Sequence, residues 1–152
     1  MMKPLFFLLF TLLFTIGSFA QNLSVSVADI KLSDWSNLLK NDQVEIAYKM
    51  LDCNKPMDGL YAEYAILSLK NKTAKTLIIS WQNEVYYNNK CASCGNESEY
   101  TYQLTLKPNE TIIPNCDLSA GQGLKVFSKW TQTNNVRTLT QINITNLSVK
   151  EE

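Results

Sequence analysis

The stretch EYTYQLTLK, residues 99–107, alternates apolar and polar side chains from one end to the other. Its apolar residues occupy every second position: Tyr100, Tyr102, Leu104 and Leu106. Successive side chains of a β-strand point to opposite faces of the sheet. A period of two therefore predicts a strand with one face on a core and the other face in water.

The same alternation recurs on both sides of this stretch. It predicts further strands over residues 22–27, 44–52, 60–70, 76–87, 124–130 and 139–149. We expect the first of these to lie at the edge of a sheet. The 60–70 stretch is apolar on both faces, which is typical of a strand in the middle of a sheet. The 139–149 stretch changes phase between Ile144 and Leu147, which predicts a β-bulge.

The stretches between these strands contain the Asn, Pro and Gly residues that turns require, at 70–75, 107–111 and 119–123. One segment has helical spacing instead. In LSDWSNLLKN, residues 32–41, Trp35, Leu38 and Leu39 would share one side of a helix, with Ser33 or Asp34 as its N-cap. The sequence thus predicts an all-β chain of six to eight strands, with one short N-terminal helical segment. Short strands without intervening helices favour an antiparallel, immunoglobulin-like β-sandwich.

The first twenty residues, MMKPLFFLLFTLLFTIGSFA, are typical of a cleaved signal peptide. Lys3 supplies a short positive region, an apolar run follows, and Ser18 and Ala20 place small residues before the cleavage point. The apolar run is shorter than the roughly 20 residues of a membrane-spanning helix, and we expect no span after cleavage. Residues 21–152 then form a single domain. We expect the protein to be exported, to the periplasm or outside the cell, with a bacterial source favoured by its many Asn and Lys residues.

The charge of the chain argues against some partners. It has 14 basic and 14 acidic side chains, so that loss of Lys3 with the leader leaves a net charge near −1. This balance offers no basic surface for nucleic acid or for an anionic membrane. We therefore expect no nucleic-acid partner, and another envelope or extracellular protein is the favoured partner.

Four cysteines, Cys53, Cys91, Cys94 and Cys116, are the most suggestive residues for chemistry. In an exported protein they are expected to form two disulfides. We expect all four at one end of the fold. Bonds from the 91–94 loop to Cys53 and Cys116 are favoured, although spacing alone does not fix the pairing. Two alternatives stay open for the Cys91-x-x-Cys94 pair, a redox dithiol and part of a zinc site.

Neither alternative has the usual context. No helical or βαβ pattern surrounds the pair, and the nearby Glu97 and Glu99 would raise the pKa of a thiolate. The other two cysteines are isolated rather than closely paired, as a four-cysteine zinc site would require. The chain also contains no histidine. It has no nucleophile elbow, phosphate-binding loop or dinucleotide motif. We therefore expect no enzyme activity, no catalytic residue, no metal and no cofactor.

Aromatic residues are the remaining candidates for binding. Tyr86 falls on the polar face of its predicted strand, and Phe127 falls out of phase with its apolar neighbours. Exposed aromatic rings on a sheet can anchor a partner, so these two residues are the candidate binding residues. The alternative is a core with both phases buried. Trp35, Trp81 and Trp130 are expected in the core.

Residues 44–149 combine short strands with one isolated cysteine, a C-x-x-C pair and a second isolated cysteine. In this pattern the chain resembles the small exported immunoglobulin-like proteins of bacterial envelopes. The resemblance implies the fold and the compartment, and it assigns no functional residue. The favoured function is a disulfide-stabilised, non-catalytic binding or assembly module. The alternative is a thiol–disulfide redox or metal-handling protein that uses Cys91 and Cys94.

Overall fold

The computed structural model of the protein describes residues 21–26, 34–117, 123–134 and 136–152. These residues form two antiparallel sheets of five strands each. Sheet A contains β1 (Gln21–Ser26), β10 (Leu139–Glu151), β5 (Leu77–Tyr87), β6 (Lys90–Cys91) and β7 (Thr101–Leu106). Sheet B contains β2 (Ser36–Lys40), β3 (Val44–Lys55), β4 (Leu60–Asn71), β8 (Thr111–Ile112) and β9 (Lys125–Trp130). Two short 3₁₀ turns, η2 (Pro56–Asp58) and η3 (Glu97–Tyr100), lie between strands.

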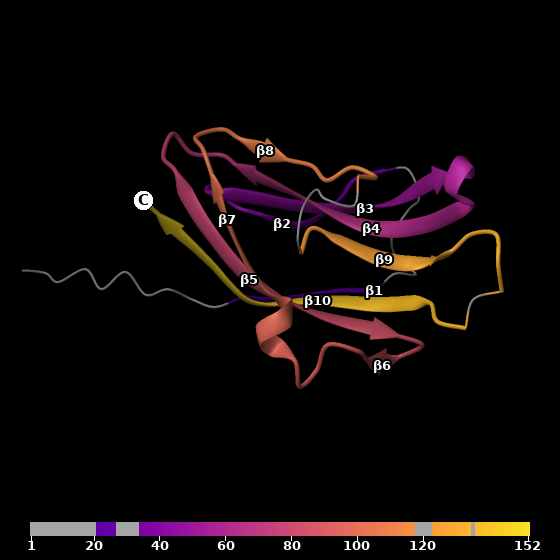
Figure 1. Ribbon diagram of the computed structural model, residues 1–152. Helices are drawn as coiled ribbons and strands as arrows, with labels where there is room; N and C mark the ends of the chain where they lie inside the picture. Colours follow the sequence, from indigo (N-terminus) through magenta and orange to yellow (C-terminus); the bar gives the residue numbers. More distant parts are fainter. Residues whose placement is uncertain (1–20, 27–33, 118–122, 135) are drawn as a thin grey trace, which may run out of the picture.

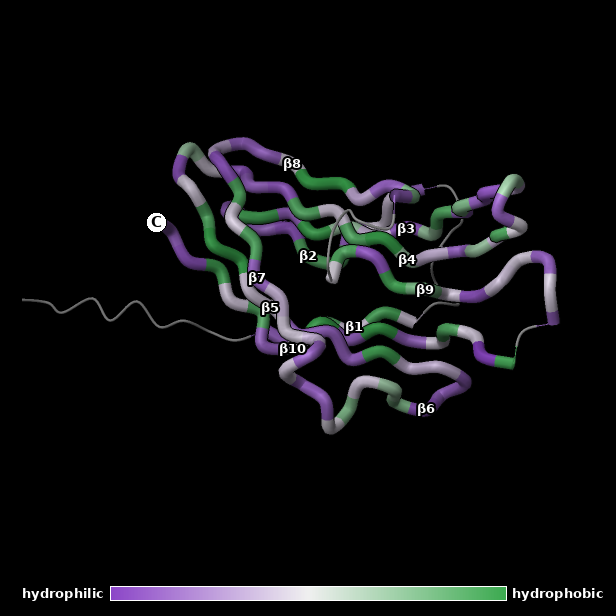
Figure 2. The backbone as a smooth tube through the Cα atoms, viewed as in Figure 1, coloured by the Kyte–Doolittle hydropathy of each residue, from purple (hydrophilic) through white to green (hydrophobic). Residues whose placement is uncertain are grey.

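The two sheets lie face to face, as Figure 1 shows. Figure 2 shows hydrophobic residues recurring along β4 and β5, as the alternation of the sequence predicts. One core cluster joins the sheets through Val44, Ile46, Leu67, Leu69, Leu77, Ile79, Trp81, Leu106, Leu124, Ile144 and Leu147. A second, smaller cluster consists of Val25, Met50, Ala65, Val85, Val126, Leu139 and Ile142. Burying a side chain of this size contributes roughly 1.5–3 kcal/mol relative to leaving it exposed.

All seven predicted strands are present, but the described residues form ten strands and not the predicted six to eight, because β2, β6 and β8 were not predicted. The doubly apolar stretch is β4, which pairs with β3 on one side and with β8 and β9 on the other, so it occupies the interior of sheet B. The predicted edge strand is β1, which pairs only with β10. The bulge in β10 is also confirmed. Its pairing with β5 shifts between Thr145 and Ser148, and Asn146 there has a φ of 53°.

The predicted helix at 32–41 is wrong. Residues 32 and 33 lie outside the described part of the chain, and Ser36–Lys40 form β2, which pairs with β3. The register of that pairing shifts between Asn37 and Leu39. Leu38 and Leu39 both pack, half-buried, against the core. An irregular strand thus puts adjacent leucines on the core, which imitates the spacing of an amphipathic helix.

The prediction that all three tryptophans lie in the core is correct only for Trp81, which is 3% exposed. Trp35 and Trp130 are 39% and 42% exposed. Trp35 precedes β2 and lies under the ammonium group of Lys49, with Nζ 4.8 Å from the ring centroid. Trp130 ends β9 opposite Ala62. Because Ala65 and Leu67 of β4 face the core, Ala62 and its neighbour Trp130 belong to the outer face of sheet B.

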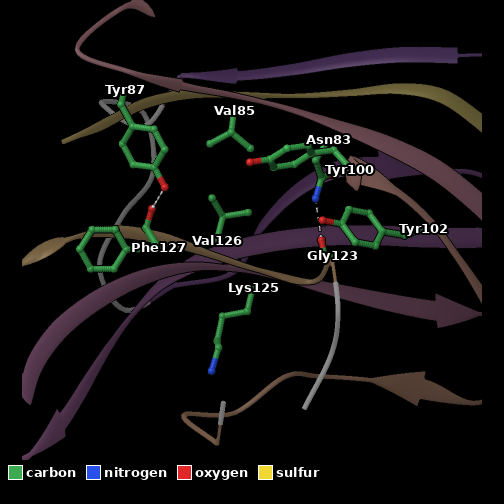
Figure 3. A pocket seen from close by; sticks show the side chains of 9 residues that line it. All are labelled: Asn83, Val85, Tyr87, Tyr100, Tyr102, Gly123, Lys125, Val126 and Phe127. Atoms are coloured by element: carbon green, nitrogen blue, oxygen red, sulfur yellow. Dashed lines mark hydrogen bonds between the residues drawn. The ribbon is translucent and has the colours of Figure 1, made fainter. Parts of the chain in front are cut away.

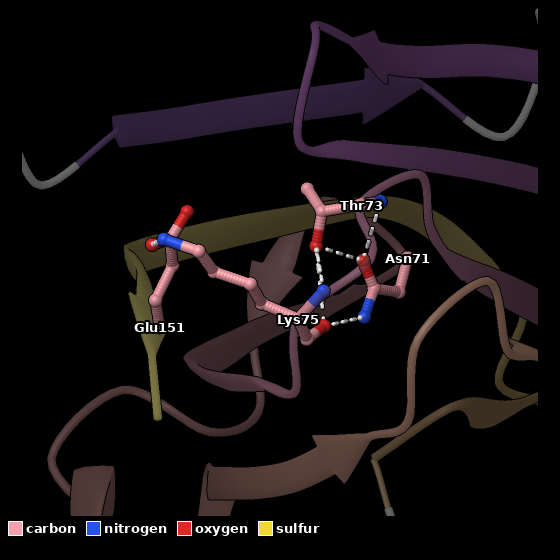
Figure 4. Close-up of polar contacts among 4 residues, drawn as sticks. All are labelled: Asn71, Thr73, Lys75 and Glu151. Atoms are coloured by element: carbon pink, nitrogen blue, oxygen red, sulfur yellow. Dashed lines mark hydrogen bonds and ion pairs between the residues drawn. The ribbon is translucent and has the colours of Figure 1, made fainter.

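A buried amide side chain stabilises the turn that connects the two sheets. Asn71, at the end of β4, is completely buried. Its Nδ2 donates to the backbone carbonyls of Lys75, Leu106 and Lys107, at 2.7, 3.3 and 2.9 Å. Its Oδ1 accepts from the backbone N–H and the hydroxyl of Thr73, at 2.8 and 2.9 Å (Figure 4). One side chain therefore joins the end of β4, the turn that follows it and the end of β7.

Candidate functional site

The first disulfide joins Cys53, near the end of β3, to Cys116 in the segment between β8 and β9. Cys53 pairs with Ala62, so it belongs to the outer face of sheet B. The ammonium group of Lys125 donates to the carbonyls of Cys116 and Asp117, at 3.4 and 2.9 Å. The disulfide and Lys125 together hold this segment across the outer face of sheet B.

The second disulfide joins Cys91 to Cys94, three residues apart. Cys94 is exposed, and its backbone N–H donates to Sγ of Cys91 at 3.1 Å. The loop between them continues the pairing with β5. The N–H of Ala92 donates to the carbonyl of Val85, and the N–H of Val85 donates to the hydroxyl of Ser93. This disulfide therefore fixes a short loop against β5.

The favoured cross-links from the 91–94 loop to Cys53 and Cys116 are therefore wrong. Figure 1 shows the β3–β4 turn and β6 at the same end of the molecule but in opposite sheets. Cys91 follows β5 in sheet A, whereas Cys53 lies on the outer face of sheet B. The two sheets thus lie between the two pairs. Each pair bonds within its own sheet, and the four described cysteines include no free thiol.

Tyr86, the first candidate binding residue, is half-buried on the outer face of sheet A. It lies opposite Gln141, and its hydroxyl donates to a carboxylate oxygen of Glu84 at 3.3 Å. The same oxygen accepts from the amide of Asn143 at 2.9 Å. Burial, followed by the neighbouring Glu84 carboxylate, raises the pKa of Tyr86. Tyr86 thus belongs to a polar network, with no other aromatic ring in contact among the described residues.

Phe127, the second candidate, lies on the outer face of sheet B in β9. Its ring is held between Tyr64 and Trp130, with ring centroids 5.7 and 5.1 Å away. It is half-buried rather than free. The two candidates therefore lie on opposite outer faces, and they do not form one site.

The structure contains a pocket that reaches in between the two sheets, with a volume of about 180 Å³. Residues of β5, β7, η3 and β9 and the glycine just before β9 line it: Asn83, Val85, Tyr87, Tyr100, Tyr102, Gly123, Lys125, Val126 and Phe127 (Figure 3). β7 and β6 lie at one edge of sheet A, and β9 lies at one edge of sheet B. The pocket is therefore formed where the two sheet edges meet. Three tyrosines, from β5, η3 and β7, contribute to its walls, whereas the ring of Phe127 lies on the outer face of sheet B.

Asn83 is the buried polar residue of this pocket. It occupies an inward position of β5 and is 1% exposed. Its Nδ2 donates to the carbonyl of Gly123 at 2.8 Å, whereas its Oδ1 has no hydrogen-bond partner among the described residues. Gly123 has a φ of 79°, and a Cβ at this position would lie 2.4 Å from the ring of Tyr102. Only glycine allows the backbone to lie this close to the ring, so Asn83, Gly123 and Tyr102 form one packed wall.

The three tyrosine hydroxyls of the pocket differ in their partners. Tyr87 donates to the backbone carbonyl of Phe127 at 2.7 Å, which joins sheet A to the edge of β9 (Figure 3). Within the described residues, the hydroxyls of Tyr100 and Tyr102 make no hydrogen bond. Burial raises the pKa of Tyr87 and of Tyr102 above the ordinary value, so both remain protonated donors at neutral pH.

Lys125 lines the pocket with the aliphatic part of its side chain, and its ammonium group lies outside the pocket. Figure 3 shows its side chain leading away from the other lining side chains. The ammonium group lies 4.9 Å from the ring centroid of Tyr64, on the outer face of sheet B. Burial lowers the pKa of Lys125, and the nearby Asp117 carboxylate opposes this effect. No acidic side chain is among the described residues that line the pocket.

The sequence contained a signal for this site that the prediction did not use. Asn83 falls in the inward phase of the 76–87 strand, between Trp81 and Val85. A polar side chain in an otherwise apolar phase needs a buried partner or a binding role. Tyr100 and Tyr102 were assigned correctly to the inward face. The meeting of β7 with β9 could not be predicted, because these strands are in different sheets.

Among the described residues, no group of three or more His, Cys, Asp or Glu side chains is arranged to hold a metal ion. No helix in this part of the chain has the length and hydrophobicity needed to cross a membrane. The predicted signal peptide, residues 1–20, lies outside the described residues.

Comparison with known proteins gives no assignment. No protein-family model matches the chain, and no curated protein has a significantly similar sequence. The pocket and the two disulfides are therefore the features from which a function can be inferred.

Proposed function

We propose that the protein is an exported, disulfide-stabilised binding or assembly module without catalytic activity, and that the pocket between the sheets is its binding site. We infer further that its two sheets form a sandwich of the immunoglobulin-like kind. The partner is another envelope or extracellular protein. Export is supported by the leader-like residues 1–20 and by the two disulfides, which oxidising compartments favour.

The observation that carries the proposal is a pocket lined by tyrosines beside the buried Asn83, whose Oδ1 has no hydrogen-bond partner among the described residues. Leaving a buried polar atom without a hydrogen bond costs about 1–3 kcal/mol. Concave sites with apolar walls and a few convergent polar groups are the usual form of binding sites. The lining residues bring four such polar groups, the Asn83 amide and the hydroxyls of Tyr87, Tyr100 and Tyr102.

A photo-crosslinking experiment in the native cells tests this proposal. Replacement of Tyr100 by p-azidophenylalanine keeps the ring and places the reactive group at the pocket. The same replacement at Tyr86 is the matched control, because it is a half-buried tyrosine on the outer face of sheet A. We expect a discrete crosslinked product from position 100 and none from position 86.

The other outcomes contradict the proposal in different ways. A product from position 86 alone would move the binding surface to the polar face around Glu84. No product from either position would argue against a protein partner on these surfaces.

A second candidate function is thiol–disulfide exchange at Cys91 and Cys94. It is favoured by the exposure of Cys94 and by the backbone N–H of Cys94, which donates to Sγ of Cys91. Such a hydrogen bond would stabilise a thiolate on Cys91 after reduction, while two thiols of the reducing partner become its disulfide. Redox titration followed by thiol alkylation tests it. A potential above about −200 mV favours exchange, whereas a potential below about −300 mV is that of a structural disulfide.

A further inference from the structure

The pocket also indicates which ligand it takes, and this inference rests on the proposed binding function. Its volume of about 180 Å³ is the first constraint. An apolar cavity of about 150 Å³ is sufficient to hold benzene. The pocket therefore has room for one six-membered ring.

The walls of the pocket favour an aromatic ring. Tyr87, Tyr100 and Tyr102 line it, with Val85 and Val126 between them, whereas the ring of Phe127 packs against Tyr64 and Trp130 on the outer face of sheet B. Aromatic rings attract one another in edge-to-face and offset arrangements, beyond the gain from buried area. A ring bound here would contact walls from both sheets.

The polar groups of the pocket argue against a sugar. The hydroxyls of Tyr100 and Tyr102 are without hydrogen bonds in the described residues, so they can serve a ligand. Nδ2 of Asn83 and the hydroxyl of Tyr87 are already committed to the carbonyls of Gly123 and Phe127. A pyranose carries about five oxygen groups, and several of them would be buried without partners, each at a cost. A ring with one polar oxygen matches the two free hydroxyls.

The charges around the pocket argue against a cation. The guanidinium carbon of Arg137 lies 4.1 Å from the ring centroid of Tyr87 and already uses one face of that ring. No carboxylate lines the described walls to balance a second positive charge. A cation would therefore be desolvated without compensation.

We propose that this pocket binds a single uncharged aromatic ring that carries one polar oxygen, such as a phenol ring. The ring can belong to a side chain of a partner polypeptide or to a free small molecule. In both cases the oxygen pairs with the hydroxyls of Tyr100 and Tyr102, and the ring packs between β5 and β9.

Titration of the ¹⁵N-labelled full-length protein with four probes tests the ligand class. The probes are p-cresol, N-acetyl-tyrosinamide, benzylamine and methyl β-glucoside. We expect p-cresol to shift the backbone amides of Asn83, Val85 and Gly123 in a saturable manner. Tighter binding of N-acetyl-tyrosinamide indicates a polypeptide side chain as the source of the ring, and tighter binding of p-cresol indicates a free compound.

Matched variants then test the role of the hydroxyls. Tyr100→Phe and Tyr102→Phe each keep the ring and remove one hydroxyl, so each should weaken p-cresol binding about fivefold, the effect of one typical hydrogen bond. Tyr86→Phe is the control and should leave binding unchanged. Val85→Phe fills the pocket and should abolish binding. Its fold is checked by the circular dichroism spectrum, and the two hydroxyl variants decide the test if it fails to fold.

The outcomes separate this inference from the proposed function. Saturable shifts from benzylamine or the glucoside, without shifts from p-cresol, would overturn the aromatic ligand but keep the pocket as a binding site. No shift from any probe would overturn the inference, and crosslinking at position 100 would then decide the proposed function independently. Equal p-cresol affinity in the wild type and in both hydroxyl variants would overturn the assigned pairing.

Discussion

Asn71 and Asn83 are both buried amides, at 0% and 1% exposure, but they differ in how many of their polar atoms are hydrogen-bonded. Asn71 uses both of its polar atoms, with three carbonyl acceptors and two donor groups of Thr73. Figure 4 shows its bonds to Lys75 and Thr73. Asn83 uses Nδ2, which bonds to Gly123 (Figure 3), and its oxygen has no partner in the part of the chain that the structure describes. Asn71 is at the well-packed connection between the sheets, and Asn83 is beside a pocket of about 180 Å³.

This difference in hydrogen bonding indicates that a polar side chain can be buried for two reasons, stability or function. A fully bonded amide replaces backbone hydrogen bonds where strands end, and it therefore contributes to stability. A buried amide with an unsatisfied polar atom lowers the stability of the folded protein, and such positions are often functional. The pattern of bonds, rather than burial, distinguishes the two regions. Substitutions in both regions test this distinction.

Asn71→Leu is expected to have the largest effect. It removes the donor for the carbonyls of Leu106 and Lys107 and the acceptor for Thr73. At about 1–3 kcal/mol for each buried group left without a partner, the free energy of unfolding should fall by about 4 kcal/mol or more. Urea denaturation measures this loss. Asn71→Asp keeps the acceptor but places a carboxylate oxygen, which cannot donate, against the same buried carbonyls, so its loss at pH 7 should be at least as large. A loss below about 1 kcal/mol in Asn71→Leu would contradict the structural role.

The two disulfides should also contribute unequally to the free energy of unfolding. Cys53–Cys116 spans 63 residues, whereas Cys91–Cys94 spans three. The chain-entropy model predicts losses of about 4 and about 2 kcal/mol when each pair is replaced by alanines. Urea denaturation of the two double variants measures both losses under the same conditions. An equal or reversed order would mean that the short disulfide does more than close its own loop.

The strands of this protein were predictable because their signal is local. The alternation of 99–107 and the phase change at Ile144 and Leu147 depend only on the direction of successive side chains, and both were confirmed. The helix at 32–41 failed because Leu38 and Leu39 pack on the core from an irregular strand. Periodicity alone does not distinguish a short irregular strand from a single helical turn.

The site was not predictable to the same extent, because it depends on contacts between distant segments. The pocket requires β5, β7 and β9 to meet, and nothing in their separate patterns specifies which sheet edges lie together. The pairing of the cysteines failed for the same reason. Tyr100 and Tyr102 were assigned to the core face, but their free hydroxyls depend on neighbours from the other sheet.

Asn83→Leu should have a much smaller effect than Asn71→Leu. The substitution removes one hydrogen bond to Gly123 and also removes the unpartnered oxygen, so the two changes oppose each other. We expect the free energy of unfolding to change by less than about 1 kcal/mol. The same urea titration, run beside that of Asn71→Leu, measures the contrast. If both substitutions cost the same, Oδ1 of Asn83 has a partner in solution and the comparison fails.

The smallest effect is expected at the surface of the Asn71 region, where Lys75 and Glu151 form an ion pair (Figure 4). The hydrogen bond from Lys75 lowers the pKa of Glu151 below its ordinary value of 4.5. A lowered pKa in the folded state means that the pair contributes stability above pH 4.5 and loses it as the pH falls through the folded value. Both side chains are substantially exposed, at 63% and 39%, so solvent and salt weaken the attraction.

Glu151→Gln should therefore change the urea midpoint only slightly at pH 7, and the difference from the wild type should disappear as the pH falls well below 4.5. Added salt at pH 7 should also reduce it, whereas salt should not reduce the loss in Asn71→Leu. The two substitutions act within the same turn, and they differ in whether the polar group is buried. A pH-independent loss in Glu151→Gln would mean that packing of the side chain, and not its charge, stabilises this region.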